Sequence, residues 1–186
     1  MERISEDISF RLATLADLSA YTDLLQRTYE SAYVHETIGL AKEHFSKEIF
    51  NNDDTQNYLR SKLEQKENQR TWLAEAGGTL VGAVTITDKG EECELSGFYV
   101  APQHQRKGVG RALWERALEF STGKDIALDL YAHNQNAIEM YERWGFEIDT
   151  TKGDNGVFYR HWPEWPESLQ AKAYYMRRRG KATSVR

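Results

Sequence analysis

The sequence predicts an α+β fold, built on a mixed α/β sheet, and two stretches with different connections support this prediction. From Trp72 to Val100, three short segments alternate apolar and polar residues and are joined by tight turns, which is typical of an antiparallel meander. From Glu94 to Thr150 the order becomes strand, helix, strand, helix, strand, so some strands must pair in parallel. With 186 residues, the chain suits one globular domain.

The N-terminal part is expected to contribute one strand and a group of helices. Residues 8–12 alternate like a short strand. Thr14, with Asp17 three residues later, resembles the capping box of a helix. Between Leu40 and Glu67 the residues are polar and helix-prone, and we expect one or two helices there, with a break near residues 51–54.

The strands and helices of these two stretches are predicted from the periodicity of apolar residues and from turn residues. Strands are expected at 72–75, 80–86, 94–100, 126–132, 146–150 and 173–176, and helices at 109–120 and 136–144. Gly77 and Gly78 form a two-residue hairpin turn, and residues 88–90 make the next turn. Gly123 and Gly145 end the two helices, because glycine readily adopts the left-handed conformation of a helix end.

The charge distribution excludes non-specific binding to nucleic acid. The chain carries 24 basic and 29 acidic residues, a formal net charge of −5. Six of the basic residues lie in residues 172–186, which hold no acidic residue. We interpret residues 177–181 as the start of a solvated basic tail. The expected organisation is a single domain over residues 1–180 and a basic C-terminal tail over residues 181–186.

The composition also predicts a cytoplasmic protein without a metal site. No apolar run approaches the roughly 18 residues that a membrane span needs, and the N-terminus lacks a signal pattern. Cys93 is the single cysteine, so a reducing compartment is expected. No neighbouring histidine would activate Cys93 as a nucleophile. The five histidines are scattered without the spacing of metal ligands.

The segment 100–111 lies between a strand end and a helix start, where free backbone N–H groups and the helix dipole favour an anion. Gly108 and Gly110 allow close approach to the backbone. The basic residues of the segment are Arg106, Lys107 and Arg111. This chemistry predicts pyrophosphate binding. A P-loop would need Gly-Lys-Ser/Thr, but this segment has Gly-Arg-Ala. A dinucleotide fingerprint would need a third glycine, but Leu113 stands there. A basic solvated loop before a helix is the simpler alternative.

Residues 95–146 resemble a known family. Gln105-x-x-Gly108-x-Gly110 is similar to the coenzyme A loop of the GNAT superfamily of acyl-CoA-dependent N-acetyltransferases. The preceding strand, 95–102, resembles the fourth strand of that family, and Asn136-Ala137-x-x-x-Tyr141-x-x-x-Gly145-Phe146 resembles its second signature. The resemblance implies a mixed, mostly antiparallel sheet of six to seven strands, flanked by about four helices. It also implies that the fourth and fifth strands separate at a bulge.

The resemblance further implies where acetyl-CoA binds as co-substrate. Backbone groups of the fourth strand would pair with the pantetheine arm, the loop amides would hold the pyrophosphate, and no metal is implied. Asn136 would reach the pantetheine region. Either Arg143 or Arg111 would contact the nucleotide phosphate. The complete set is Phe98, Tyr99, Val100, Gln105, Arg106, Lys107, Gly108, Val109, Gly110, Arg111, Asn136 and Arg143.

The implied chemistry is direct attack of a primary amine on the thioester in a ternary complex. An aliphatic amine has a pKa near ~10.4, so some group must accept its proton. Glu94 is the candidate base, because strand alternation places Glu94, Ser96, Phe98 and Val100 on one face. Alternatives are Glu92, His133 and Asp129, or a merely solvated strand entry. Tyr141 matches the general acid of the family, although it would also suit a core position.

The resemblance also implies that the acceptor contacts two segments, Tyr29–Leu63 and Lys152–Leu169. The first combines aromatic and acidic residues, which suits a cationic amine, but a solvated helix explains it equally. In the second, Trp162 and Trp165 form either a lid or a packing surface against the protein's own core or a partner subunit.

The overall pattern is also similar to the polyamine-acetylating branch of the family. The expected function is therefore acetylation of a small amine, polyamine or amino compound by a cytoplasmic monomer or homodimer. The alternatives are acetylation of protein or peptide amino termini, and a non-catalytic coenzyme A-binding module.

Overall fold

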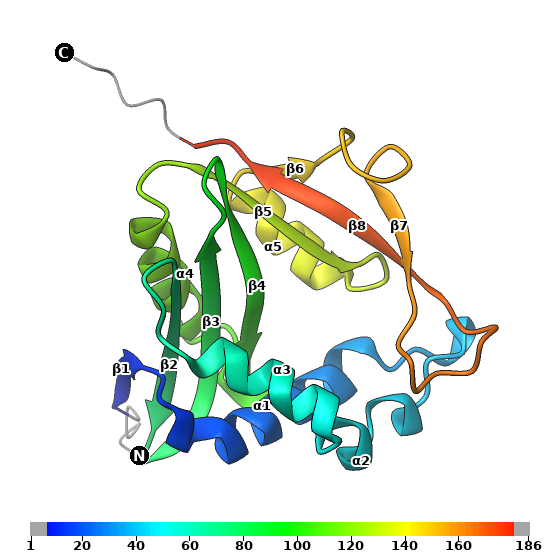
Figure 1. The fold of residues 1–186 in the computed structure, drawn as a ribbon, viewed down its shortest axis with the longest axis horizontal. Helices are drawn as coiled ribbons and strands as arrows, with labels where there is room; N and C mark the ends of the chain where they lie inside the picture. Colours follow the sequence, from blue (N-terminus) through cyan, green and yellow to red (C-terminus); the bar gives the residue numbers. More distant parts are fainter. Residues whose placement is uncertain (1–6, 181–186) are drawn as a thin grey trace, which may run out of the picture.

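The computed structural model describes residues 7–180, in which an eight-stranded sheet carries helices on both faces (Figure 1). The strands are β1 (Ile8–Leu12), β2 (Gln69–Ala76), β3 (Thr79–Asp88), β4 (Glu92–Val100), β5 (Asp125–Tyr131), β6 (Phe146–Ile148), β7 (Val157–Arg160) and β8 (Ala171–Arg178). The α-helices are α1 (Leu18–Tyr33), α2 (Lys47–Phe50), α3 (Asp53–Leu63), α4 (Val109–Phe120) and α5 (Gln135–Arg143). Short 3₁₀ helices are η1 (Leu15–Asp17), η2 (Glu36–Ile38), η3 (Lys42–Phe45) and η4 (Pro102–His104).

The strand order confirms a mixed, mostly antiparallel sheet. The order is β1-β2-β3-β4-β5-β8-β6, and β7 pairs with the first part of β8. Among the described strand pairs, β4–β5 is the parallel one. The strand β7 exceeds the expected six to seven strands. It has four residues and follows a turn with positive φ at Gly153, Asn155 and Gly156, so it is too short to show a clear alternation.

Two helical layers cover the sheet. In Figure 1, α1, α2 and α3 lie in front of it, whereas α4 and α5 lie behind. The front layer packs Tyr21, Leu24 and Leu25 of α1 into the core, and the expected break before α3 is present, because Asn52 caps that helix. At the back, α4 lies close to β3. A Cβ on Gly82 would be 3.0 Å from Leu113 Cδ1 and 3.3 Å from the carbonyl oxygen of Tyr99, so glycine gives α4 room to approach the strand closely.

The central feature of the sheet is the separation of β4 from β5. Only the first three residues of β4, Glu92 to Glu94, pair with β5, and beyond them the two strands diverge (Figure 1). On its other side, β4 has a bulge: Thr85 of β3 faces Gly97, and Ile86 faces Leu95, which leaves Ser96 without a partner. The expected separation at a bulge is thus confirmed.

The interpretation of residues 177–181 as a solvated tail is wrong for Arg177 and Arg178, the last two residues of β8. These residues extend β8 and its end: Arg177 binds Asp149, with Nε to Oδ2 at 2.9 Å, and also Glu92, with Nη2 to Oε2 at 2.9 Å. Arg178 Nε donates to the carbonyl of Trp144 at 3.0 Å. Basic residues enter the sheet here because carboxylates of β4, β5 and the segment after β6 surround Arg177. Residues 181–186 lie outside the described part of the chain.

Candidate active site

The glycine loop connects the end of β4 to the start of α4. Gly108 is the N-cap of α4 with φ of 89°, a left-handed conformation, and a Cβ there would meet open space. The first backbone bond of the helix runs from Ala112 N to Gly108 O, at 3.0 Å. The amides of residues 109–111 therefore have no acceptor within the helix and form a local anion-binding geometry.

The basic side chains of the loop differ in solvent exposure and in ion pairing. Arg106 and Lys107 are exposed, and Arg106 adopts φ of 59°. Arg111, in contrast, lies along the helix and pairs with Glu115, with Nε to Oε1 at 3.0 Å. Gln105 ties the loop to the strand, because its Nε2 donates to the carbonyl of Val100 at 3.1 Å.

The expectation that Glu94, Ser96, Phe98 and Val100 share one face of β4 is wrong. The bulge at Ser96 adds one residue, so the alternation after it is reversed. Glu94 lies toward α3, where its charge acts on the side chain of Lys62, and Ser96 also contacts Lys62. Phe98 lies on the opposite face of the sheet, against Tyr141 of α5.

The rear face of β4 adjoins the start of α4. A Cβ on Gly110 would lie 3.6 Å from both Phe98 Cζ and Val100 Cγ2, so the helix approaches these two side chains closely. Tyr99 points forward instead, with its hydroxyl 3.3 Å from that of Tyr29. The side chains of Phe98 and Val100 therefore lie on the rear face of the sheet. The side chain of Tyr99 lies on the front face, so only the backbone of Tyr99 borders the gap between β4 and β5.

Tyr141 lies on the buried stripe of α5. Its ring centroid is 6.3 Å from that of Phe98 and 5.3 Å from that of Phe146. Burial raises the pKa of Tyr141 well above the ordinary value, because a phenolate is disfavoured away from water. The phenol is therefore neutral at physiological pH.

The acidic candidates for a base differ in their surroundings. Glu94 is half-exposed and pairs with Lys89, with Oε2 to Nζ at 3.2 Å. Glu92 is held between Lys152 and Arg177, at 2.9 Å from each, which marks it as part of a structural network. Of these two carboxylates, Glu94 has the greater access to solvent.

The other two candidates are also engaged. His133 Nε2 donates to the carbonyl of Tyr33 at 3.1 Å, and burial lowers the pKa of His133. Asp129 forms an ion pair with Arg160, whose guanidinium lies 4.6 Å from the ring centroid of Tyr131. Both groups lie near the end of β5.

Asn136 and Arg143 lie exposed at opposite ends of α5. The helix begins one residue before the expected start, because Asn134 caps it: its side chain accepts from the amide of Ala137 at 3.3 Å. The structure thus separates the capping asparagine from Asn136, which stays free for another contact.

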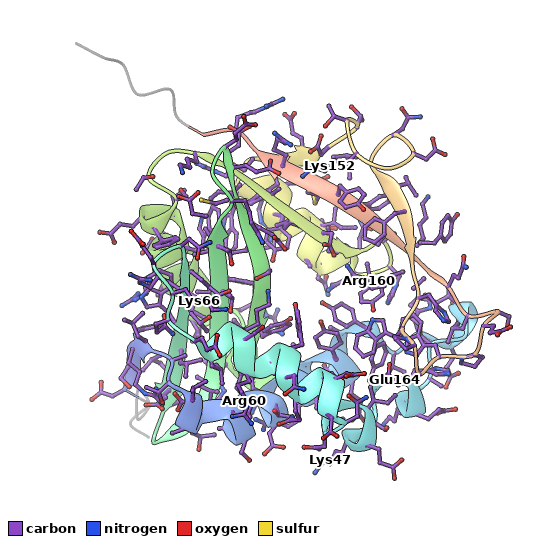
Figure 2. All side chains as sticks on the ribbon, in the orientation of Figure 1. Lys47, Arg60, Lys66, Lys152, Arg160 and Glu164 are labelled. Atoms are coloured by element: carbon purple, nitrogen blue, oxygen red, sulfur yellow. The ribbon has the colours of Figure 1, made fainter. Side chains whose placement is uncertain are left out.

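The expected acceptor segments meet in a cluster of aromatic rings. The Tyr29 ring has five ring neighbours at centroid distances of 4.8–5.9 Å: Tyr33, Phe45, Phe50, Tyr99 and Trp162. Trp162 and Trp165 stack at 5.4 Å, and Trp165 is only 4% exposed. Their loop packs against the protein's own core and is tied to the front helices, because Asn52 Nδ2 donates to Glu164 Oε1 at 2.7 Å. Glu164 is labelled in Figure 2.

Three neighbouring groups were not anticipated from the sequence. The Tyr131 hydroxyl is buried, without a hydrogen-bond partner of normal geometry in the described chain. Arg160 extends from β7 toward the end of β5 (Figure 2), and Lys62 reaches Ser96 from α3. The alternation in β5 places Tyr131 on the same face as the exposed Asp129, so it does not predict burial of Tyr131. The burial of Tyr131 and the positions of Arg160 and Lys62 depend on tertiary packing.

Within residues 7–180, no group of three histidine, cysteine, aspartate or glutamate side chains is arranged to hold a metal ion. The helices of this part include none long and apolar enough to cross a membrane. Cys93 is buried, and burial raises the pKa of its thiol, which disfavours the thiolate.

Comparison with known proteins places these features in one family. The model of the acetyltransferase (GNAT) family matches residues 22–146. Among curated proteins, the peptidyl-lysine N-acetyltransferase YiaC of Escherichia coli strain K12 is 35% identical over 81 residues, which cover 44% of this chain and 52% of YiaC. The N-alpha-acetyltransferase RimI of Mycobacterium tuberculosis is 35% identical over 78 residues, which cover 40% of this chain and 49% of RimI. These matches span about half the length of the curated relatives.

A solved structure supports the same assignment at the level of the fold. The PaiA N-acetyltransferase of Thermoplasma acidophilum, in complex with coenzyme A, has a TM-score of 0.70 and 17% identity. The match covers 93% of this chain and 99% of that one. The family match extends over more than half of the chain and contains the glycine loop, the separated strands and Tyr141. The chain therefore belongs to the GNAT acetyltransferase family.

Proposed function

We propose that this protein is an N-acetyltransferase that transfers the acetyl group of acetyl-CoA to a primary amine by direct attack in a ternary complex. The observation that carries the proposal is the edge of β4 beyond Glu94 that has no β5 partner, together with the free amides at the start of α4, to which β4 connects through the glycine loop. Unpaired strand backbone can pair with an extended pantetheine arm, and a helix N-terminus suits a pyrophosphate.

The chain offers suitable groups for each part of coenzyme A. The amides of residues 109–111 and the open space beside Gly108 suit the pyrophosphate, and Arg106 and Lys107 supply exposed positive charge. Backbone groups of residues 98–100 would bind pantetheine, with Asn136 nearby on α5. Arg143 is the better candidate for the nucleotide phosphate, because Glu115 partly neutralises Arg111.

In the proposed chemistry, the amine loses a proton and its lone pair attacks the thioester carbonyl. Glu94, on the front face, accepts that proton through water. Tyr141, on the rear face, donates its phenolic proton to the leaving thiolate, and burial keeps this phenol protonated until the thiolate forms. The separated strands lie between the two groups, so each can approach the thioester from its own side.

We propose a small amine, such as a polyamine, as the acceptor. The loop with Trp162 and Trp165 is fastened to the front helices by the Asn52–Glu164 bond and by Trp165 Nε1, which donates to the carbonyl of His44 at 3.2 Å. A fastened loop limits the room for a polypeptide. A protein acceptor is the second candidate, because YiaC and RimI are named for peptidyl-lysine and amino-terminal substrates.

The test is thiol release from acetyl-CoA with a panel of polyamines, amino compounds and peptides. Turnover that depends on a small amine would support the proposal, and turnover with peptides alone would select the second candidate. Binding of acetyl-CoA without turnover of any amine would indicate a non-catalytic coenzyme A-binding module.

A further inference from the structure

One lysine of the front layer reaches the bulge of β4. Lys62 lies at the C-terminal end of α3, and its Nζ donates to the hydroxyl of Ser96 at 3.1 Å. The Nζ also lies 4.9 Å from the ring centroid of Tyr58. Ser96 is the bulge residue, just beyond the point where β4 leaves β5. The amine of Lys62 is therefore fixed beside the gap between the strands.

Lys62 lacks the carboxylate partner that most of the other lysines among residues 7–180 have. Five of them form ion pairs with carboxylates: Lys42, Lys66, Lys89, Lys124 and Lys152. Within residues 7–180, no carboxylate lies within ion-pair distance of Lys62, and Glu94 acts on it only from further away. Burial lowers the pKa of Lys62, against the opposing effect of Glu94, so its neutral, nucleophilic form is more accessible than that of an exposed lysine.

We propose that Lys62 is an internal acetyl acceptor, which the protein modifies with acetyl-CoA when no free amine occupies the site. The inference rests on the proposed function, because it requires the thioester to lie in the gap beside Ser96. A side chain held at that place replaces a second substrate, and fixed geometry raises the effective concentration of its amine.

The reaction is balanced without a further reactant. The Lys62 ammonium loses one proton to solvent, directly or through Glu94, and the amine attacks the thioester carbonyl carbon. A carbon–nitrogen bond forms and the carbon–sulfur bond breaks. The second proton leaves the nitrogen, and the thiolate is protonated by Tyr141, which regains a proton from solvent. The products are acetylated Lys62, free coenzyme A and one proton.

Acetylation would change the front face of the site. The modified side chain loses its positive charge and two of its donor hydrogens, and its acetyl group fills space beside Glu94. Each molecule can react once at this position, so the modification limits itself to one acetyl group and competes with transfer to a free amine.

The experiment uses the full chain, incubated with acetyl-CoA without any amine and analysed by peptide mass spectrometry over time. We expect one acetyl group on Lys62, added at least about 100-fold faster than on Lys66, which is exposed in the segment after α3 (Figure 2). An amine substrate and an excess of free coenzyme A should each slow the modification. Lys62→Arg should abolish it, whereas Lys66→Arg, the matched control, should retain it.

Two results would overturn the inference while leaving the proposed function intact. One is amine-dependent thiol release by a protein whose Lys62 stays unmodified. The other is acetylation of Lys62 at the rate of Lys66, unaffected by coenzyme A or by Tyr141→Phe, because this would be chemical acetylation only. A protein with neither thiol release nor modification would refute both proposals together. Because the wild-type chain is itself measured, the result does not depend on the folding of a variant.

Discussion

The role of Tyr141 can be tested by removing a single oxygen atom. In Tyr141→Phe the ring contacts with Phe98 and Phe146 remain, and only the hydroxyl is lost. The structure records no hydrogen bond of this hydroxyl among residues 7–180, so its removal breaks no such bond, and we expect the free energy of unfolding to change by less than about 0.5 kcal/mol. Loss of a general acid typically reduces the rate about 100-fold or more, or about 2.7 kcal/mol in activation free energy.

The assay is kcat for thiol release, measured from neutral to alkaline pH, together with urea unfolding of each protein. Burial raises the pKa of Tyr141, so the wild-type rate should show no loss from deprotonation of this tyrosine near its ordinary pKa of about 10. Tyr174→Phe, on β8, is the matched control and should retain kcat. Full kcat in Tyr141→Phe at all pH values would refute the assignment, and equal losses of kcat in both variants would show a general effect of removing a hydroxyl.

Further predictions concern the loop, the tryptophan pair and the acid range. Gly108→Ala places a side chain at φ of 89°, so it should cost about 1 kcal/mol in unfolding free energy and raise the KM for acetyl-CoA more than that for the amine. Trp165→Ala removes a residue that is 4% exposed and should cost about 3 kcal/mol, measured by urea unfolding; an unchanged amine KM would exclude a lid role. Hydrogen bonds from Arg11 lower the pKa of Asp17 to about 2, below its unfolded value of about 3.9. The stabilisation is present above the unfolded value and is lost as pH falls toward 2, so Arg11→Met should show a shallower loss of stability over that range.

The sequence predicted correctly those helices, strands and turns that are determined by residues close together in the chain. The helix at 109–120 matches α4, and the Gly77–Gly78 turn adopts the expected positive φ values of 55° and 77°. The strand at 8–12 matches β1. A helix period, a cap and a glycine pair are visible within a few residues, and tertiary packing did not override them here.

The bulge and the ion-pair network could not be predicted in this way. Whether β4 inserts an extra residue depends on its register with β3, and Ser96 itself carries no local mark of it. Similarly, the sequence near Arg177 predicts a basic tail, because it contains no acidic residue. The partners of Arg177 are Glu92, Asp125 and Asp149, which come from distant segments of the chain. The charges that make this strand favourable are brought together only by the folded sheet.

The bulge at Ser96 also explains how one short strand can serve both sides of the proposed reaction. Without it, Glu94 and Phe98 would lie on the same face, because two residues of the same parity share a face of a regular strand. With the extra residue, Glu94 lies on the front face with Lys62, and Phe98 lies on the rear face with Tyr141. The pairing between β4 and β5 ends at Glu94, two residues before the bulge, so the backbone that changes face also has an unpaired edge. A proton acceptor in front, a proton donor behind and free backbone between them therefore arise from one local irregularity.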